Sequence, residues 1–204
     1  FITKIKKIIE MTCWACGKLL MDEDSSPEFA RAITIRNPKA RFNAVWKLCK
    51  GKMVCEGQPP DGTEDNQQSE DKLPRHQGCG HKQPIVRKEG LELYGTWKPD
   101  KDSVEENAQP DKRRIAPDDA QRIFKMMTDD DIKKMGLNVD YARPEWMCIS
   151  VLAVPPPPVR PSISIDGTSA GQRGEDDLTY KLGDIIRANS NLRQAEQNGS
   201  PQHV

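Results

Sequence analysis

The chain has little of what marks several common protein classes. Aromatic residues make up only 5% of its 204 residues and apolar residues 35%, so a core can form but not every segment can belong to it. The 31 basic and 31 acidic residues cancel, which excludes an overall basic surface that binds nucleic acid through charge alone. No apolar run approaches the roughly 20 residues of a membrane span, and the first residues lack the apolar stretch of a signal peptide. We expect a soluble intracellular chain without a membrane partner.

Familiar catalytic motifs are also missing. The sequence contains no phosphate-cradling glycine motif, no Ser/His/Asp arrangement and no metalloprotease signature. Three acidic residues, Glu175, Asp176 and Asp177, could suggest Mg²⁺ ligands, but carboxylates at the start of a helix are favoured by its macrodipole. We interpret them as helix-capping residues. No catalytic or cofactor-binding residue is predicted, and we expect no catalysis by this chain alone.

The zero net charge conceals an alternation along the chain. Residues 1–58 carry 11 basic and 6 acidic residues, whereas residues 59–72 carry 1 and 5. Acidic stretches of this kind contain no aromatic residue and are typical of disorder. We therefore predict disordered surface insertions near 57–77 and 99–112.

Periodic patterns predict an α+β fold. Apolar residues at helical spacing, proline starts and capping residues indicate helices over 1–10, 38–50 and 117–127, and a short one that begins after Thr128 and stops at Gly136. Residues 84–97 read as a β-hairpin with a turn over 88–90. The apolar run 149–154 predicts a buried strand, which Pro155–Pro158 should end in extended polyproline geometry.

The longest helical pattern spans residues 175–197. Its seam positions alternate by four and three, the spacing of a coiled coil: Leu178, Leu182, Ile185 and Leu192 are apolar, and Asn189 is the polar residue among them. Asn198-Gly199 predicts its end. A lone amphipathic helix needs a partner to bury its stripe, and no later helical pattern follows. We therefore expect one half of a helical hairpin, and a chain that is a piece of something longer.

Six cysteines occur, and four of them predict a zinc site. Cys13 and Cys16 form a Cys-x-x-Cys-Gly knuckle that presents one edge of a tetrahedral Zn²⁺ site. Two more soft ligands are needed. Cys55 and Cys79 are the best candidates, because each lies in a short polar context that bounds the first acidic insertion. Four thiolates leave no open position for a catalytic water, so the predicted site is structural.

These cysteines also admit other interpretations. A thioredoxin-like redox pair at Cys13 and Cys16 would need a βαβ scaffold, and the sequence shows no βαβ pattern. Disulfides would need an oxidising compartment, and nothing in the sequence indicates one. His81 is the main rival ligand. Cys49, on the apolar face of a predicted helix, and Cys148, beside Trp146, are interpreted as core residues.

Several strings together resemble a known family, the largest subunit of eukaryotic RNA polymerase II. The strings are Phe1-Ile2-Thr3-Lys4-Ile5-Lys6-Lys7, the knuckle from Cys13 to Leu20, Cys49-Lys50-Gly51-Lys52-Met53-Val54-Cys55-Glu56, Gly78-Cys79-Gly80 with Gln83-Pro84, Ala142-Arg143-Pro144-Glu145-Trp146-Met147, Pro155-Pro156-Pro157-Pro158-Val159-Arg160-Pro161-Ser162 and Arg173-Gly174-Glu175-Asp176-Asp177-Leu178-Thr179. The proline-rich string favours the polymerase II form over polymerases I and III. The similarity runs from one end of the chain to the other.

This resemblance implies a nuclear DNA-directed RNA polymerase, a nucleotidyltransferase, of which the chain is an internal fragment. Residues 1–174 would form a zinc-binding clamp-head region that closes over the DNA template and RNA–DNA hybrid, and 175–204 the first helix and tip of the clamp coiled coil. The family's zinc ligands fall on Cys13, Cys16, Cys55 and Cys79. Implied partners are the other polymerase subunits, nucleic acid, and initiation and elongation factors at the tip.

The family's catalytic string, Asn-Ala-Asp-Phe-Asp-Gly-Asp, holds Mg²⁺ and does not occur in these 204 residues. Magnesium would therefore belong to the intact enzyme only. The alternative is a free-standing zinc-stabilised interaction module without polymerase activity.

Overall fold

A computed structural model describes residues 1–56, 77–99, 109–165, 167 and 171–201. It has a mixed α+β fold, as predicted, in which Phe1–Ile149 form one unit and Ser150–Val204 a second. The predicted insertions at 57–77 and 99–112 lie mainly outside the described residues. Asp111 and Lys112, however, are already part of a strand, so the second insertion was predicted too long.

The helices of the first unit begin where capping chemistry allows. They are α1 (Ile2–Met11), α2 (Pro27–Ile33), α3 (Pro38–Cys49), α4 (Pro117–Lys125), α5 (Asp129–Lys134) and the 3₁₀ turn η1 (Pro144–Met147). Proline occupies the first turn of α2, α3 and α4, where its missing N–H costs nothing. The α1, α3, α4 and α5 predictions are confirmed, whereas α2 was not predicted.

A three-stranded antiparallel sheet flanks these helices, in the order β1 (Ile85–Glu89), β2 (Glu92–Trp97) and β3 (Asp111–Arg114). The predicted hairpin is confirmed, with a tighter turn in which Gly90 has φ +59°. Its register pairs Val86 with Gly95 and Lys88 with Leu93. No sequence pattern predicted β3, because its four residues are all charged and exposed.

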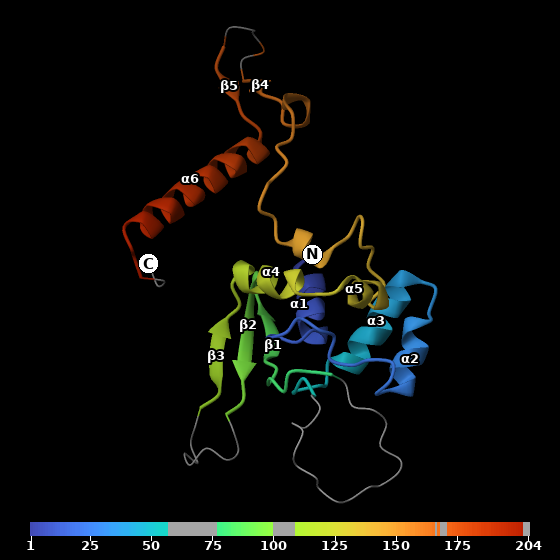
Figure 1. Ribbon diagram of the computed structural model, residues 1–204. Helices are drawn as coiled ribbons and strands as arrows, with labels where there is room; N and C mark the ends of the chain where they lie inside the picture. Colours follow the sequence, from blue (N-terminus) through green and yellow to red (C-terminus); the bar gives the residue numbers. More distant parts are fainter. Residues whose placement is uncertain (57–76, 100–108, 166, 168–170, 202–204) are drawn as a thin grey trace, which may run out of the picture. The chain divides into compact units, whose positions relative to one another are not determined.

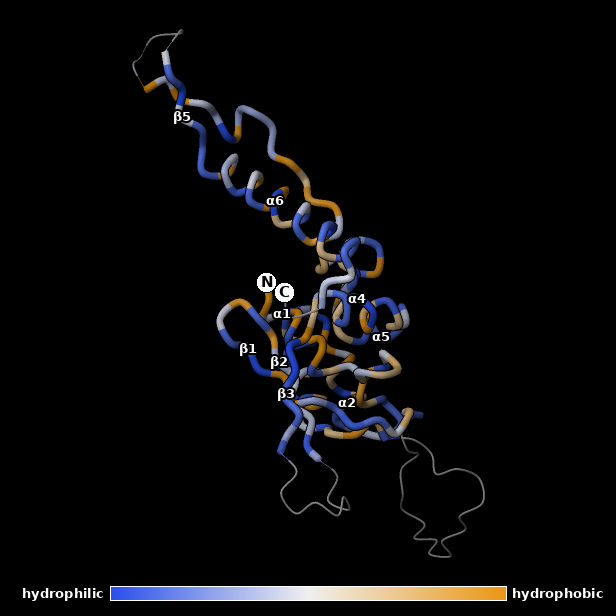
Figure 2. The backbone as a smooth tube through the Cα atoms, turned by 90° about the vertical axis from the view of Figure 1, so that its left-hand side faces the viewer, coloured by the Kyte–Doolittle hydropathy of each residue, from blue (hydrophilic) through white to orange (hydrophobic). Residues whose placement is uncertain are grey.

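The core of the first unit is built around α1. This helix contacts α3, β1, α4 and η1, and Ile8, Ile9 and Met11 are buried along it. Figure 1 shows α1 between the sheet and α3, and Figure 2 shows the hydrophobic segments gathered in these elements. Phe29, Phe42, Val45, Ile123, Phe124, Ile132 and Met135 complete the centre of the core. Because α1 runs directly into Cys13, its burial also fixes the position of the knuckle.

The second unit consists of a 3₁₀ turn η2 (Pro157–Val159), a two-residue pairing of β4 (Ile163–Ser164) with β5 (Arg173–Gly174), and α6 (Asp177–Gln197). Asp176 caps α6 by accepting a hydrogen bond from the Leu178 N–H at 2.8 Å, so the capping interpretation is confirmed for this residue. Gly199, at φ +62°, follows the helix end as predicted. No residue of α6 is buried.

Two predictions near the unit boundary are wrong. Residues 149–154 form no strand, and their apolar side chains are exposed, with Val151 at 87%. An apolar run becomes a strand only when a neighbouring strand accepts its backbone hydrogen bonds, and none is paired with it among the described residues. The proline run is extended at Pro156 but then tightens into η2 at Pro157, so it is not a straight polyproline segment.

Among the described helices, none combines the length and apolar character needed to cross a membrane.

Candidate metal centre

The knuckle is a short antiparallel turn at the end of α1. Thr12 pairs with Leu19, and the Cys13 N–H donates to the Lys18 carbonyl at 2.8 Å. The chain reverses at Gly17, which has φ +71° and lies so close to α4 that an added Cβ would come within 2.6 Å of the Met126 Cβ. Glycine is therefore required there both for its conformation and for lack of space.

A second turn, formed by residues 53–56 and 78–83, carries the other two cysteines. Val54 pairs with Lys82, the Cys55 N–H donates to the His81 carbonyl at 2.9 Å, and the Gly80 N–H donates to the Cys55 carbonyl at 2.7 Å. These bonds hold Cys79 beside Cys55 although the chain between them lies largely outside the described residues. The sulfurs of this turn and of the knuckle thus approach one another from two separate pieces of backbone.

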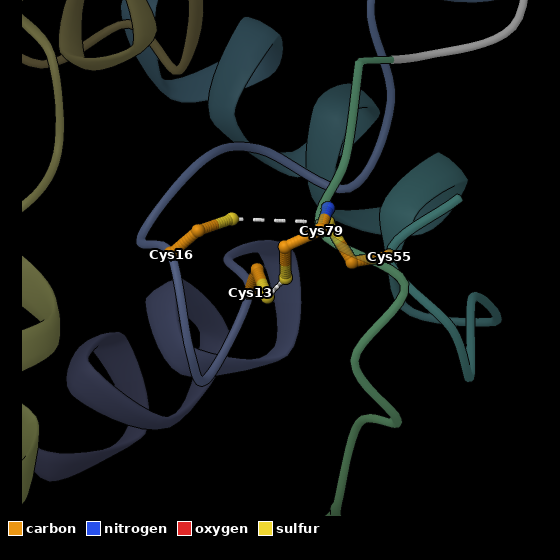
Figure 3. Close-up of side chains that lie close together, drawn as sticks. All are labelled: Cys13, Cys16, Cys55 and Cys79. Carbon is orange, nitrogen blue, oxygen red and sulfur yellow. Dashed lines mark hydrogen bonds between the residues drawn. The ribbon is translucent and has the colours of Figure 1, made fainter. Parts of the chain in front are cut away.

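The four cysteine sulfurs form one cluster, drawn in Figure 3. All of them lie within 4.8 Å of one another, with 3.5 Å between the sulfurs of Cys13 and Cys79 and 3.8 Å between those of Cys16 and Cys55. A tetrahedral ion with Zn–S bonds of about 2.3 Å needs sulfurs roughly 3.8 Å apart, whereas a disulfide needs about 2.05 Å. The four cysteines could therefore hold a metal ion, and their geometry and chemistry fit zinc.

Burial and hydrogen bonding act on these thiols in opposite directions. Desolvation raises the pKa of Cys16 to about 11 and also raises the pKa of Cys55. At Cys13 desolvation is again the largest cause and opposes ionisation, but hydrogen bonds from the backbone amides of Cys16 and Ala15 and from the thiols of Cys79 and Cys16 together lower the pKa of the thiol. Thiolates packed this closely repel one another, so a divalent cation is the natural partner of the ionised set.

Backbone amides also contact the sulfurs directly. The Ala15 N–H donates to the Cys13 sulfur at 3.4 Å, and the Cys79 N–H donates to the Cys55 sulfur at 3.4 Å. Both turns therefore offer N–H groups that offset negative charge on sulfur. This arrangement suits a closed structural metal site better than a nucleophilic cysteine, which would need access to a substrate.

A comparison with known families identifies the chain. Its whole length, residues 1–204, matches the family model described as RNA polymerase Rpb1, domain 1. The chain belongs to this family. It is therefore part of a DNA-directed RNA polymerase largest subunit, and polymerase subunits and nucleic acid are the partners of such a subunit.

The other candidate ligands of this Rpb1-family chain lie outside the cluster. Cys49 is buried on α3, where desolvation raises its pKa to about 12, and it belongs to the apolar core. Cys148 is half-buried and packs against that core. His81 is exposed, and its Nδ1 lies 2.6 Å from the Lys82 carbonyl rather than near a sulfur.

Gln83 is part of this site and was not predicted from the sequence. Its side chain is buried and contacts both the knuckle and the second turn. A single glutamine carries no periodicity or spacing signal. Only the approach of the two turns, which are about seventy positions apart in the sequence, reveals it.

Proposed function

We propose that this chain is a clamp region of the RNA polymerase II largest subunit, acting in the nucleus. Its membership in the Rpb1 family supports the polymerase assignment, and the string Pro155-Pro156-Pro157-Pro158-Val159-Arg160-Pro161-Ser162 favours the polymerase II form. In this role the chain closes over the DNA template and the RNA–DNA hybrid. Nucleotidyl transfer and its Mg²⁺ ions belong to other parts of the enzyme.

A structural zinc held by Cys13, Cys16, Cys55 and Cys79 is the second part of the proposal. The observation that carries it is the convergence of four sulfurs within 4.8 Å of one another. Zinc, when bound, supplies four strong bonds that tie the end of α1 to the segment leading into β1. This link also joins the two ends of the acidic, polar segment between Cys55 and Cys79, and it thereby stabilises the first unit.

We further propose the domain organisation 1–174 and 175–204, with α6 as one helix of the clamp coiled coil and its tip near Asn198. The exposed stripe along α6 supports this role, because Leu178, Ile185 and Leu192 are all between 43% and 58% exposed. A stripe of this spacing is stable when a second helix covers it. Initiation and elongation factors would dock at the tip.

Metal analysis tests the zinc site. We expect about one zinc per chain, because one tetrahedral site is proposed. Cys55→Ser should lower both zinc content and the free energy of unfolding, since metal binding is coupled to folding. Cys49→Ser is the matched control and should retain zinc, because Cys49 lies outside the cluster. Zinc retained in Cys55→Ser and lost in Cys49→Ser would contradict the ligand set.

The polymerase assignment is tested in the cell. A tagged form of the subunit that carries this chain should purify with DNA-templated RNA synthesis and occupy protein-coding genes. Occupancy confined to ribosomal or transfer RNA genes would instead assign it to another polymerase form. Its reading frame should contain the string Asn-Ala-Asp-Phe-Asp-Gly-Asp downstream.

The alternative is a zinc-stabilised interaction module that acts without a polymerase. The same purification separates the two, because such a module would retain zinc yet copurify with no RNA synthesis. The four-cysteine cluster is common to both functions, so zinc content alone does not distinguish them.

A further inference from the structure

Gln83 bridges the two turns that carry the cysteines. Its side chain is only 5% exposed and makes three hydrogen bonds. Its Oε1 accepts from the Trp14 N–H at 2.8 Å, and its Nε2 donates to the His81 carbonyl at 2.7 Å and to the Cys13 sulfur at 3.3 Å. The carbonyl oxygen of this buried amide therefore binds the knuckle, and its amide nitrogen binds both the knuckle and the second turn.

The orientation of this amide is fixed by its partners. The Trp14 N–H can only donate, so it must face Oε1, and the His81 carbonyl can only accept, so it must face Nε2. The remaining Nε2 hydrogen then points to Cys13. Turning the amide over would set donor against donor and acceptor against acceptor in a buried site, which is strongly disfavoured.

The backbone of Gln83 is held as firmly as its side chain. Its N–H donates to the Met53 carbonyl at 2.7 Å, and Pro84 and β1 follow directly. The amide therefore reaches the knuckle from a segment that is anchored in the second turn and the sheet. Because the Gln83 Nε2 donor is held in place, its hydrogen bond favours one position of the Cys13 sulfur.

We propose that Gln83 is the positioning residue of the metal centre: its amide locks the knuckle to the second turn and donates a hydrogen bond to the Cys13 thiolate. This inference rests on the metal site proposed above. The bond withdraws electron density from the sulfur and restrains its motion, so it slows loss of the metal and tunes the metal–sulfur bond. Groups that orient metal ligands in this way typically change metal affinity by about 10–100-fold.

Two substitutions separate the two halves of this role. Gln83→Met keeps much of the volume but removes the donor and the acceptor. Gln83→Glu keeps an acceptor for the Trp14 N–H, loses both donors and places a negative charge beside the thiolate. If donation to sulfur matters, Gln83→Glu will be at least as impaired as Gln83→Met, whereas a role limited to the Trp14 contact predicts that it will resemble the wild type.

The experiment measures metal release and the metal–sulfur bond in the full chain. Zinc transfer to a chromogenic chelator should be roughly 10–100-fold faster in both variants than in the wild type. In the Co²⁺-substituted chain, the sulfur-to-cobalt charge-transfer band of Gln83→Met should move to longer wavelength, because a sulfur without its hydrogen bond donates more strongly. Gln121→Met on α4 is the matched control, since none of the sulfur hydrogen bonds among the described residues involves it.

Each result decides one claim. Wild-type release rates and an unshifted cobalt band in both variants would overturn the role of Gln83, even if their melting temperatures fell, because lower stability alone does not change the metal–sulfur bond. A wild-type chain that binds neither metal would overturn the metal site, and the role of Gln83 with it. Faster release in Gln121→Met as well would show a general effect of altered packing and would also overturn the proposal.

Discussion

Single residues decide whether the two cysteine turns can meet. Gly78 passes so close to the second turn that an added Cβ would lie 2.3 Å from the Glu56 carbonyl oxygen and 2.6 Å from the Cys55 sulfur. Both contacts are far below van der Waals distance, and the backbone there is held by the bond from the Gly78 N–H to the same carbonyl. The absence of a side chain at position 78 therefore lets the backbone pass close enough to bring Cys79 beside Cys55.

Gly78→Ala should destabilise the first unit by about 1–3 kcal/mol, the usual cost of forcing atoms into a packed site, and should lower zinc content. Gly51→Ala is the matched control, because a Cβ there meets nothing within 4 Å and its φ is not positive. Urea unfolding and metal analysis measure both effects. Equal stability and zinc content in the two variants would contradict the close approach at Gly78.

Helix ends in the first unit depend on single capping contacts. The Thr128 hydroxyl accepts a hydrogen bond from the Asp131 N–H at 3.2 Å at the start of α5, and Gly136, at φ +80°, ends the segment. This short helix has only one buried side chain of its own, Ile132. Its stability must therefore come largely from the cap and from packing of Ile132 and Met135 into the core.

Thr128→Ala should lower the free energy of unfolding by about 1 kcal/mol, because an orphan N–H at the start of α5 loses its acceptor. Thr128→Ser keeps the hydroxyl and should behave much more like the wild type. Chemical denaturation of the three proteins at equal zinc content tests this. A Ser variant as unstable as the Ala variant would indicate that the methyl group, rather than the cap, is what stabilises this site.

At the scale of the whole molecule, the metal site and the exposed helix belong to different units. All four clustered cysteines lie in Phe1–Ile149, whereas α6 lies in Ser150–Val204 and buries no residue. Zinc-binding free energy is folding free energy for the segments it connects. The stability of the first unit should therefore depend on the metal, and that of α6 should not.

Removal of zinc with a chelator should accelerate hydrogen exchange in α1, the knuckle and the 78–89 segment, while exchange along α6 stays unchanged. The reason is that α1 and β1 are joined through the cluster as well as through the core. Exchange followed by mass spectrometry resolves the two regions. Equal acceleration in α6 would show that the two units are coupled, contrary to this expectation.

Local signals in the sequence determined much of the first unit. Helical spacing and proline starts predicted α1, α3 and α4, Thr128 predicted the start of α5, and alternation with a turn glycine predicted the β1–β2 hairpin. These features are set by neighbours in the chain, which is why periodicity and capping reveal them. The same holds for the capped start of α6 at Asp176.

Tertiary structure decided what depends on distant partners. The charged strand β3 exists because β2 offers it an edge, and residues 149–154 remain exposed because no described strand does the same for them. Cysteine spacing predicted which four sulfurs would meet, and the structure brings them together, although their role as zinc ligands stays a prediction. Gln83 was beyond the reach of the sequence, because its significance arises only where two turns far apart in the chain pack against each other.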